Sequence, residues 1–137
     1  MAATGTQSIS SGTHTLLALG SAVIDTVSGC TTGTSRYTVQ TGYAGKYQIN
    51  ASIRYTDAAT GQSFRLYKNG SAAGAAGTGA MGYGVGSYNA DLVFSCIVDL
   101  SEDDYVQLYV WNQGGGTTQA SADGWHRTSF SGHKVSV

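Results

Sequence analysis

The strongest pattern in the chain is an alternation of apolar and polar residues over positions 45–55. Tyr47 and Ile53 belong to the apolar side, whereas Gln48 and Asn50 belong to the polar side. Successive side chains of a β-strand point to opposite faces, so we expect a strand with one face on an apolar core. A helix would distribute the same apolar residues around its circumference. The rest of the chain can be interpreted as strands arranged around this one.

Further segments have the composition of strands, and Gly-rich turns separate them. The expected strands are two short ones with a bend at Gly20 in 14–27, then single strands in 36–40, 62–68, 88–100, 104–112 and 125–137. The expected loops are 28–35, 71–87 and 114–123. No helical period occurs over a useful length, so the pattern predicts an all-β sandwich or barrel. The expected core residues are Tyr47, Ile49, Ile53, Leu92, Phe94, Val106, Leu108 and Phe130.

The strand expected at 104–112 has two useful faces. Its valines and leucine lie on one side, and Tyr105, Tyr109 and Trp111 form a row on the other. Such a row is costly to leave in water and indicates a partner surface. A scatter of half-exposed rings is the simpler alternative.

Length and charge limit the kinds of partner. A chain of 137 residues is expected to form one domain. Its net charge is -1 and its few Lys and Arg residues are scattered, so we expect no nucleic-acid partner. No segment approaches the ~20 apolar residues of a membrane span, so no membrane contact is expected. The first residues lack the basic start and apolar run of a signal peptide, which favours synthesis and folding in a cytoplasm.

The N-terminal residues 1–12 are Ser, Thr, Gly and Ala with no apolar periodicity. We expect them to form an extended arm outside a single domain at 13–137. Such an arm is suited to pairing with the exposed strand edge of a neighbour. Cys30 and Cys96 are expected to be two reduced, buried thiols, and a disulfide between them is the alternative.

Several motifs in positions 36–137 match a known pattern. They are Gly45, Tyr47 and Ile49 for Gly-x-Tyr-x-Phe, Leu66, Lys68, Asn69 and Gly70 for Leu-x-Lys-Asn-Gly, Leu100, Asp104, Tyr105, Val106 and Leu108 for Leu-x-x-Gly-Asp-x-Val-x-Leu, and Phe130 and Gly132 for Phe-x-Gly. With these motifs the chain resembles the globular head of complement component one-q and its tumour-necrosis-factor-like relatives. It departs from them at Gln40, where the family usually has Pro, and at Asp103, where it usually has Gly.

The resemblance implies a ten-strand jelly-roll sandwich that assembles as a compact homotrimer. It also implies that the strands at 45–55 and 104–112 and the C-terminal strand share the sheet that faces the threefold axis. The residues expected at the trimer interface are therefore Tyr105, Tyr109, Trp111, Gln48 and Asn50.

The sequence contains no catalytic constellation, and we expect no enzyme activity, no cofactor and no metal site. His14, His126 and His133 are far apart in the sequence and lack metal-ligand spacing. His133 could meet its copies on a trimer axis, but a plain surface histidine is the simpler interpretation. The acidic run 102–104 lacks the spaced oxygen ligands of a calcium loop and is expected to be a solvated turn. The Gly-rich segment 71–87 lacks the Lys-Ser/Thr pair of a phosphate-binding loop.

Two functional classes remain. The first is a structural virion protein, a trimer that decorates a bacteriophage capsid, binds the major capsid protein and is assembled in the host cytoplasm. It is favoured because no signal peptide, collagen-like Gly-X-Y run or coiled-coil heptad is present. The second is the tip of a phage tail fibre that binds a host receptor or glycan. In that case Tyr83, Trp125 and His126 would supply a ligand-facing loop surface.

Overall fold

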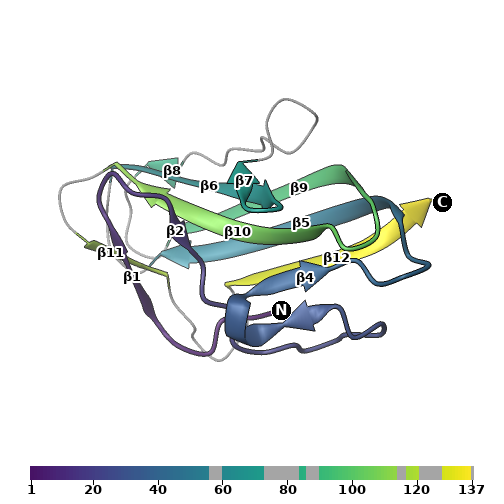
Figure 1. Ribbon diagram of the computed structural model, residues 1–137. Coiled ribbons are helices and arrows are strands. Elements are labelled where there is room, and N and C mark those ends of the chain that lie inside the picture. The colour runs from purple at the N-terminus through teal and green to yellow at the C-terminus, as the bar shows by residue number, and fades with distance from the viewer. Residues whose placement is uncertain (56–59, 73–83, 86–89, 114–116, 121–127, 137) are drawn as a thin grey trace.

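The computed structural model of the chain describes residues 1–55, 60–72, 84–85, 90–113, 117–120 and 128–136. The described strands form two sheets that lie one behind the other as a sandwich (Figure 1). We call them the β5 sheet and the β10 sheet after their central strands. The all-β sandwich predicted from the alternation is confirmed.

The β5 sheet is built around β5 (Gly45–Tyr55), whose bounds are those predicted. Along one edge β5 pairs antiparallel with the whole of β9 (Ala90–Leu100). Along the other edge it pairs with β12 (Ser129–Ser136). At its end Tyr55 pairs with β11 (Thr117–Ala120), which continues the sheet to β1 (Gln7–Ser10).

The β10 sheet is centred on β10 (Tyr105–Asn112). One edge of β10 pairs with β6 (Thr60–Lys68), and the other pairs with β4 (Arg36–Thr38) and β2 (Thr15–Leu16). The remaining elements are β3 (Cys30–Thr31), β7 (Ser71–Ala72), β8 (Gly84–Val85) and the 3-10 turn η1 (Thr32–Thr34). All strand pairs within this sheet are antiparallel.

The core lies between the inner faces of the two sheets. Of the eight predicted core residues, all but Phe94 are buried. Phe94 is half-buried and packs on the fully buried Phe64 of β6, with ring centroids 4.7 Å apart. Burial of one large apolar side chain contributes roughly 1.5–3 kcal/mol to the free energy of unfolding, so this layer dominates the stability of the chain.

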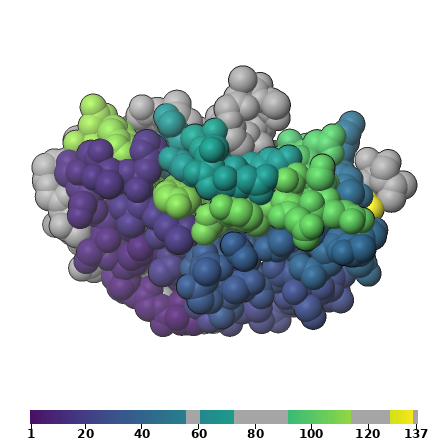
Figure 2. Space-filling view, viewed as in Figure 1, coloured from purple at the N-terminus to yellow at the C-terminus, as the bar shows by residue number. Residues whose placement is uncertain are grey.

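The expectation that residues 1–12 lie outside the core is wrong. Met1 is buried and Ile9 is 0% exposed within the core. The amide of Ala3 donates to the carbonyl of Thr128 at 2.9 Å, and β1 pairs with β11. The buried side chains of Met1, Ala3 and Ile9 and main-chain pairing hold this segment without any apolar periodicity. Figure 2 shows these N-terminal residues in purple, packed against the rest of the surface.

The expectations for several short segments also need correction. Only Thr15–Leu16 forms a strand in 14–27, because the amides of Ala18 and Leu19 donate to the side-chain oxygens of Gln7 and Ser35 instead of a neighbouring strand. The segments 28–35 and 71–87, expected as loops, contain short elements, β3 and η1 in the first and β7 and β8 in the second. The segment 114–123, also expected as a loop, contains β11. Its sequence is not apolar, but β1 supplies the main-chain partner that a strand requires.

Candidate functional site

The outer face of the β5 sheet carries a ladder of uncharged polar side chains. Gln48 and Asn50 project from β5, and Ser95 lies between them on β9. The amide of Gln48 donates to the hydroxyl of Ser95, which in turn donates to the side-chain oxygen of Asn50 at 2.8 Å. These hydrogen bonds hold the polar row of the central strand against the neighbouring strand.

Exposed aliphatic residues flank this ladder. Val93 and Ile97 on β9 are 71% and 53% exposed, and Val135 on β12 is 46% exposed. Val93 lies opposite Ser52 and Ile97 lies opposite Gln48, so both adjoin the polar row. We call this surface, made of Gln48, Asn50, Ser52, Val93, Ser95, Ile97, Ser131 and His133, with Val135 at its β12 end, the β5 face. The sequence analysis missed its apolar members, although the unbroken runs Leu92–Phe94 and Cys96–Val98 depart visibly from alternation.

Charged residues lie at the two ends of the β5 face. Lys46 pairs in register with Asp99 at one end, and Arg54 projects from β5 at the other. The centre of the face is therefore uncharged among the described residues of β5 and β9. Such a centre can be buried without the cost of removing an ion from water.

The outer face of the β10 sheet carries the predicted aromatic row. Tyr105, Tyr109 and Trp111 all lie on it, and all three are half-buried within the single chain. Tyr109 stacks on Tyr67 of β6 with ring centroids 4.0 Å apart. Trp111 stacks on His14 at 6.3 Å. These rings are thus partly covered by contacts within their own sheet and with the segment that precedes β2.

The same face includes two cationic contacts. The guanidinium of Arg36 lies 5.0 Å from the ring centroid of Tyr105, a cation–π geometry. Burial lowers the pKa of His14, and the neighbouring Arg65 lowers it further. The imidazole is therefore neutral at pH 7 and packs against the aromatic rings of Tyr67 and Trp111. We call this surface, made of His14, Arg36, Tyr67, Tyr105, Tyr109 and Trp111, the β10 face.

The five residues predicted for one trimer interface lie on opposite faces of the sandwich. Gln48 and Asn50 belong to the β5 face, whereas Tyr105, Tyr109 and Trp111 belong to the β10 face. The expectation that β5, β10 and β12 share a sheet is wrong, because β10 takes all its partners from β2, β4 and β6. The two groups cannot form one continuous surface. Which of them contacts another copy stays a prediction.

The second group of predicted site residues, Tyr83, Trp125 and His126, lies outside the described residues. The structure therefore leaves the predicted ligand-facing loop surface as a prediction. His133 lies on β12 and is exposed, as a plain surface histidine would be.

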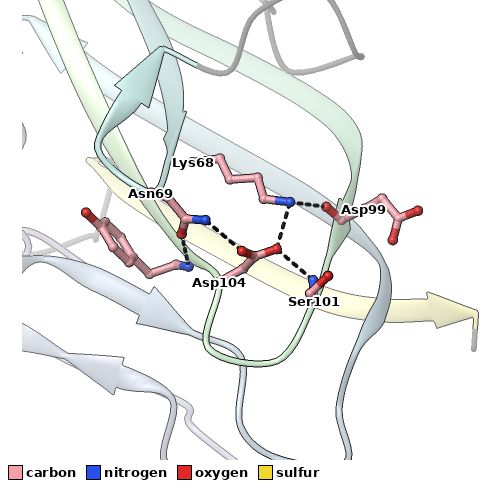
Figure 3. Close-up of polar contacts among 6 residues, drawn as sticks. Lys68, Asn69, Asp99, Ser101 and Asp104 are labelled. Atoms are coloured by element: carbon pink, nitrogen blue, oxygen red, sulfur yellow. Dashed lines mark hydrogen bonds and ion pairs between the residues drawn. The ribbon is translucent and has the colours of Figure 1, made fainter.

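The acidic turn before β10 is held by donors from the chain itself (Figure 3). The carboxylate of Asp104 receives Lys68 Nζ at 2.7 Å, Asn69 Nδ2 at 2.6 Å and the amide of Ser101 at 2.7 Å. Partial burial raises the pKa of Asp104, but these donors outweigh it and leave the pKa below its ordinary value. Asn69 also accepts from the amide of Tyr105 at 2.9 Å, so the cluster fixes the turn.

The described residues provide little evidence for a metal site or for a reactive thiol. Among the residues that the structure describes, no group of three or more His, Cys, Asp or Glu side chains could hold a metal ion. Cys30 and Cys96 are free and half-buried, and burial raises the pKa of both thiols, so they are protonated at pH 7. In the described part of the chain, no helix has the length and apolar character to cross a membrane.

Solved structures with the same architecture include two proteins of animals. The globular domain of zebrafish complement 1qA protein superimposes with a TM-score of 0.60 at 11% identity, covering 96% of this chain and 98% of that chain. The Eiger TNF from S. frugiperda gives a TM-score of 0.65 at 17% identity, covering 99% and 91%. No protein-family model and no curated protein sequence matches the chain.

These comparisons establish the fold. The chain has the jelly roll of complement 1q-like and tumour necrosis factor-like proteins, as the motifs predicted. At such identities the likeness extends to architecture alone, because one fold hosts many functions. Assembly and biological role must therefore be argued from the two outer faces.

Proposed function

We propose that the chain is a non-enzymatic structural protein that associates with copies of itself as a homotrimer through the β5 face. The observation that carries this proposal is the exposure of Val93, Ile97 and Val135 beside an uncharged polar ladder. Aliphatic side chains grouped on one sheet face are costly to leave in water. Burying them contributes about 25 cal/mol per Å² of apolar surface, which favours association.

The lack of charge at the centre of the β5 face suits a rotational axis. Around a threefold axis each residue near the axis meets its own copies. A charged side chain there would face like charges, whereas Gln48, Asn50 and Ser95 can hydrogen-bond to their copies. The charges of Lys46 and Arg54 lie at the ends of the face, where they can stay in water.

Sedimentation velocity tests the self-association. The unmodified chain is expected to sediment as a trimer at micromolar concentration, and Ile97→Lys is expected to sediment as a monomer that keeps its β-sheet circular dichroism. Ile24→Lys is the matched control, because Ile24 is also exposed, at 79%, but is not a residue of the β5 sheet. A monomeric unmodified chain, or equal loss of trimer in both variants, would exclude the β5 face as the interface.

For the biological role we propose decoration of a bacteriophage capsid, with the major capsid protein as partner. A trimer matches the threefold and quasi-threefold positions of an icosahedral shell. Jelly rolls are also a recurrent architecture of viral capsid proteins. In this role the β5 faces meet in the trimer, and the β10 faces and the ends of the sandwich remain free for the shell.

The second candidate is the host-recognition tip of a tail fibre. It is favoured by the β10 face, where Tyr67, Tyr109 and Trp111 are only half-buried. Jelly rolls also serve as lectin domains, and aromatic rings present an apolar body together with a polar group. Immunogold labelling of virions separates the candidates: label on heads supports decoration, and label on tail tips supports the fibre. Absence of label from virions would exclude both.

A further inference from the structure

A cavity of about 520 Å³ opens at the β12 edge of the β5 sheet. It lies between β12 and the segment 23–27, and residues of β4 and β5 line its inner end. Its apolar lining includes Val23, Ile24, Val27, Tyr37, Tyr47 and Phe130. The volume falls within the roughly 300–1,000 Å³ of small-molecule sites.

The tyrosines of this cavity present apolar surface because their polar ends are engaged. The rings of Tyr37 and Tyr47 lie 5.9 Å apart, and burial together with the Tyr47 hydroxyl raises the pKa of Tyr37. The hydroxyl of Tyr47 donates to the carbonyl of Tyr43 at 2.6 Å. A molecule bound here would therefore contact mainly ring carbons and would not need to hydrogen-bond to the hydroxyls of Tyr37 and Tyr47.

The rim of the cavity is apolar as well. Val23 and Ile24 are 54% and 79% exposed, and Tyr43 is 44% exposed. Together they form an apolar lip beside the opening. Residues of this kind gain a partner when an apolar chain enters the cavity.

Lys134 places a positive charge in the lining of the cavity, which also includes Met1, whose N-terminal amine donates to the carbonyl of Phe130 at 2.6 Å. In β12, Lys134 shares the inward side with Phe130 and Gly132, opposite Tyr47 in register, and it is half-buried. Among the described residues no carboxylate pairs with its amine. Asp25 also lines the cavity, but its two carboxylate oxygens accept from the amides of Gly29 and Cys30 at 3.0 and 2.9 Å.

An inward-pointing lysine on an edge strand can also serve to prevent pairing with another sheet. That role explains the position of Lys134 in β12. It does not require an apolar cavity beside the amine or exposed Val23 and Ile24 at the opening. The combination of an apolar cavity with a lysine that pairs with no carboxylate among the described residues is the arrangement that recognises an amphiphile with one negative charge.

We propose that this cavity binds a linear alkyl carboxylate of the fatty-acid type. The alkyl chain lies among the tyrosine rings and the aliphatic rim, and the carboxylate pairs with the amine of Lys134. His133, exposed next to it on β12, lines the same opening and can add a hydrogen bond. Ser131 and His133, which lie in register with Asn50 and Gln48, also line the cavity, so the site adjoins the β12 side of the β5 face.

Titration calorimetry with laurate, below its micelle concentration, tests the site on the whole chain. We expect saturable binding of one laurate per chain and at least tenfold weaker binding of dodecyltrimethylammonium, which has the same chain length and the opposite charge. Lys134→Gln should weaken laurate binding about tenfold and leave the cation's binding unreduced. Ile24→Glu, at the exposed rim, should weaken laurate binding further without lowering the melting temperature.

Lys46→Gln is the matched control, because Lys46 is an exposed lysine on β5 that does not line the cavity. Its laurate affinity should equal that of the unmodified chain. Equal loss in Lys46→Gln, equal affinity for both amphiphiles or no saturable binding would each overturn the proposal. So would laurate binding only to the dissociated Ile97→Lys chain, because the cavity would then be covered by a second copy.

Discussion

The two outer faces of the sandwich differ in how their apolar groups are satisfied. The β10 face has the larger rings, yet Tyr109 and Trp111 stack on Tyr67 and His14 and are half-buried in a single chain. The β5 face has only aliphatic side chains of modest size, yet Val93 and Ile97 are mostly in water. From side-chain size alone, the β10 face would be expected to leave more apolar surface in water than the β5 face.

The difference arises from the contacts that other residues of the chain make with each face. On the β10 face, β2 follows His14 and pairs with the edge of β10, so His14 lies against Trp111. On the β5 face, Gln48 and Asn50 contact Ser95 and leave the neighbouring aliphatic side chains open. An apolar row therefore indicates a partner only after contacts within the chain have been taken into account.

The largest effect is expected from removing the segment that joins the two sheets. Within residues 1–11, β1 (Gln7–Ser10) pairs with β11 of the β5 sheet, and Ser11 bridges to Asn112 of the β10 sheet. A chain that starts at Gly12 loses this pairing and the fully buried Ile9. We expect it to remain unfolded, or to lose more than about 4 kcal/mol of stability, measured by urea unfolding followed by circular dichroism.

Single substitutions at Ile9 separate packing from pairing. Ile9→Ala should cost about 2–5 kcal/mol, and the control Ile9→Val about 0.5–1.5 kcal/mol. If the chain starting at Gly12 melts like the full chain, residues 1–11 are an arm after all. In that case the pairing of β1 and the burial of Ile9 contribute nothing measurable to the free energy of unfolding.

Much of the fold could be predicted from the sequence because alternation is a local signal. The bounds of β5 and seven of the eight core residues follow from parity, and the turn motif ending in Asn69 and Gly70 indicated the jelly roll. The short strands were less predictable. β11 has no apolar pattern, and its existence depends on pairing with β1, about a hundred residues away.

The candidate site was less accessible to sequence analysis. Parity correctly placed Tyr105, Tyr109 and Trp111 away from the core, but it carries no information on which sheet a strand joins. The predicted interface therefore mixed residues of two faces. The cavity beside Lys134 was also invisible, because segment 23–27 is brought to β12 by contacts that no local pattern encodes.

An intermediate effect on stability is expected from a substitution on the β10 face. Tyr109→Ala removes the stack on Tyr67, and an aromatic pair contributes about 0.5–1.5 kcal/mol beyond its buried area. We expect the stability of the chain to fall by about 2 kcal/mol, while its sedimentation as a trimer is unchanged. Tyr109→Phe keeps the ring and should change neither. Loss of the trimer with an unchanged unfolding free energy would assign the interface to the β10 face.

The smallest effect is expected at a side-chain cluster that links the two sheets around Lys68 and Asp104. Lys68 ends β6 of the β10 sheet, and its amine donates both to Asp104 and to the carbonyl of Asp99 in β9 at 3.0 Å. Figure 3 shows the carboxylate of Asp99 pointing away from this amine. Asp104→Asn should therefore weaken the link, and Asp99→Asn, which keeps the carbonyl, should not.

The dependence on pH gives this last prediction its sign. Because the pKa of Asp104 in the folded chain lies below its ordinary value of 3.8, its ionised form is the one that stabilises the fold. The contribution is fully present above pH 3.8 and is lost as the pH falls towards the lower folded pKa. Urea unfolding should show Asp104→Asn less stable than the unmodified chain by about 1 kcal/mol at pH 7. The gap should narrow below pH 3.8, and Asp99→Asn should show no gap at pH 7. A gap of constant size down to pH 2 would mean that Asp104 stabilises the fold through its shape and not through its charge.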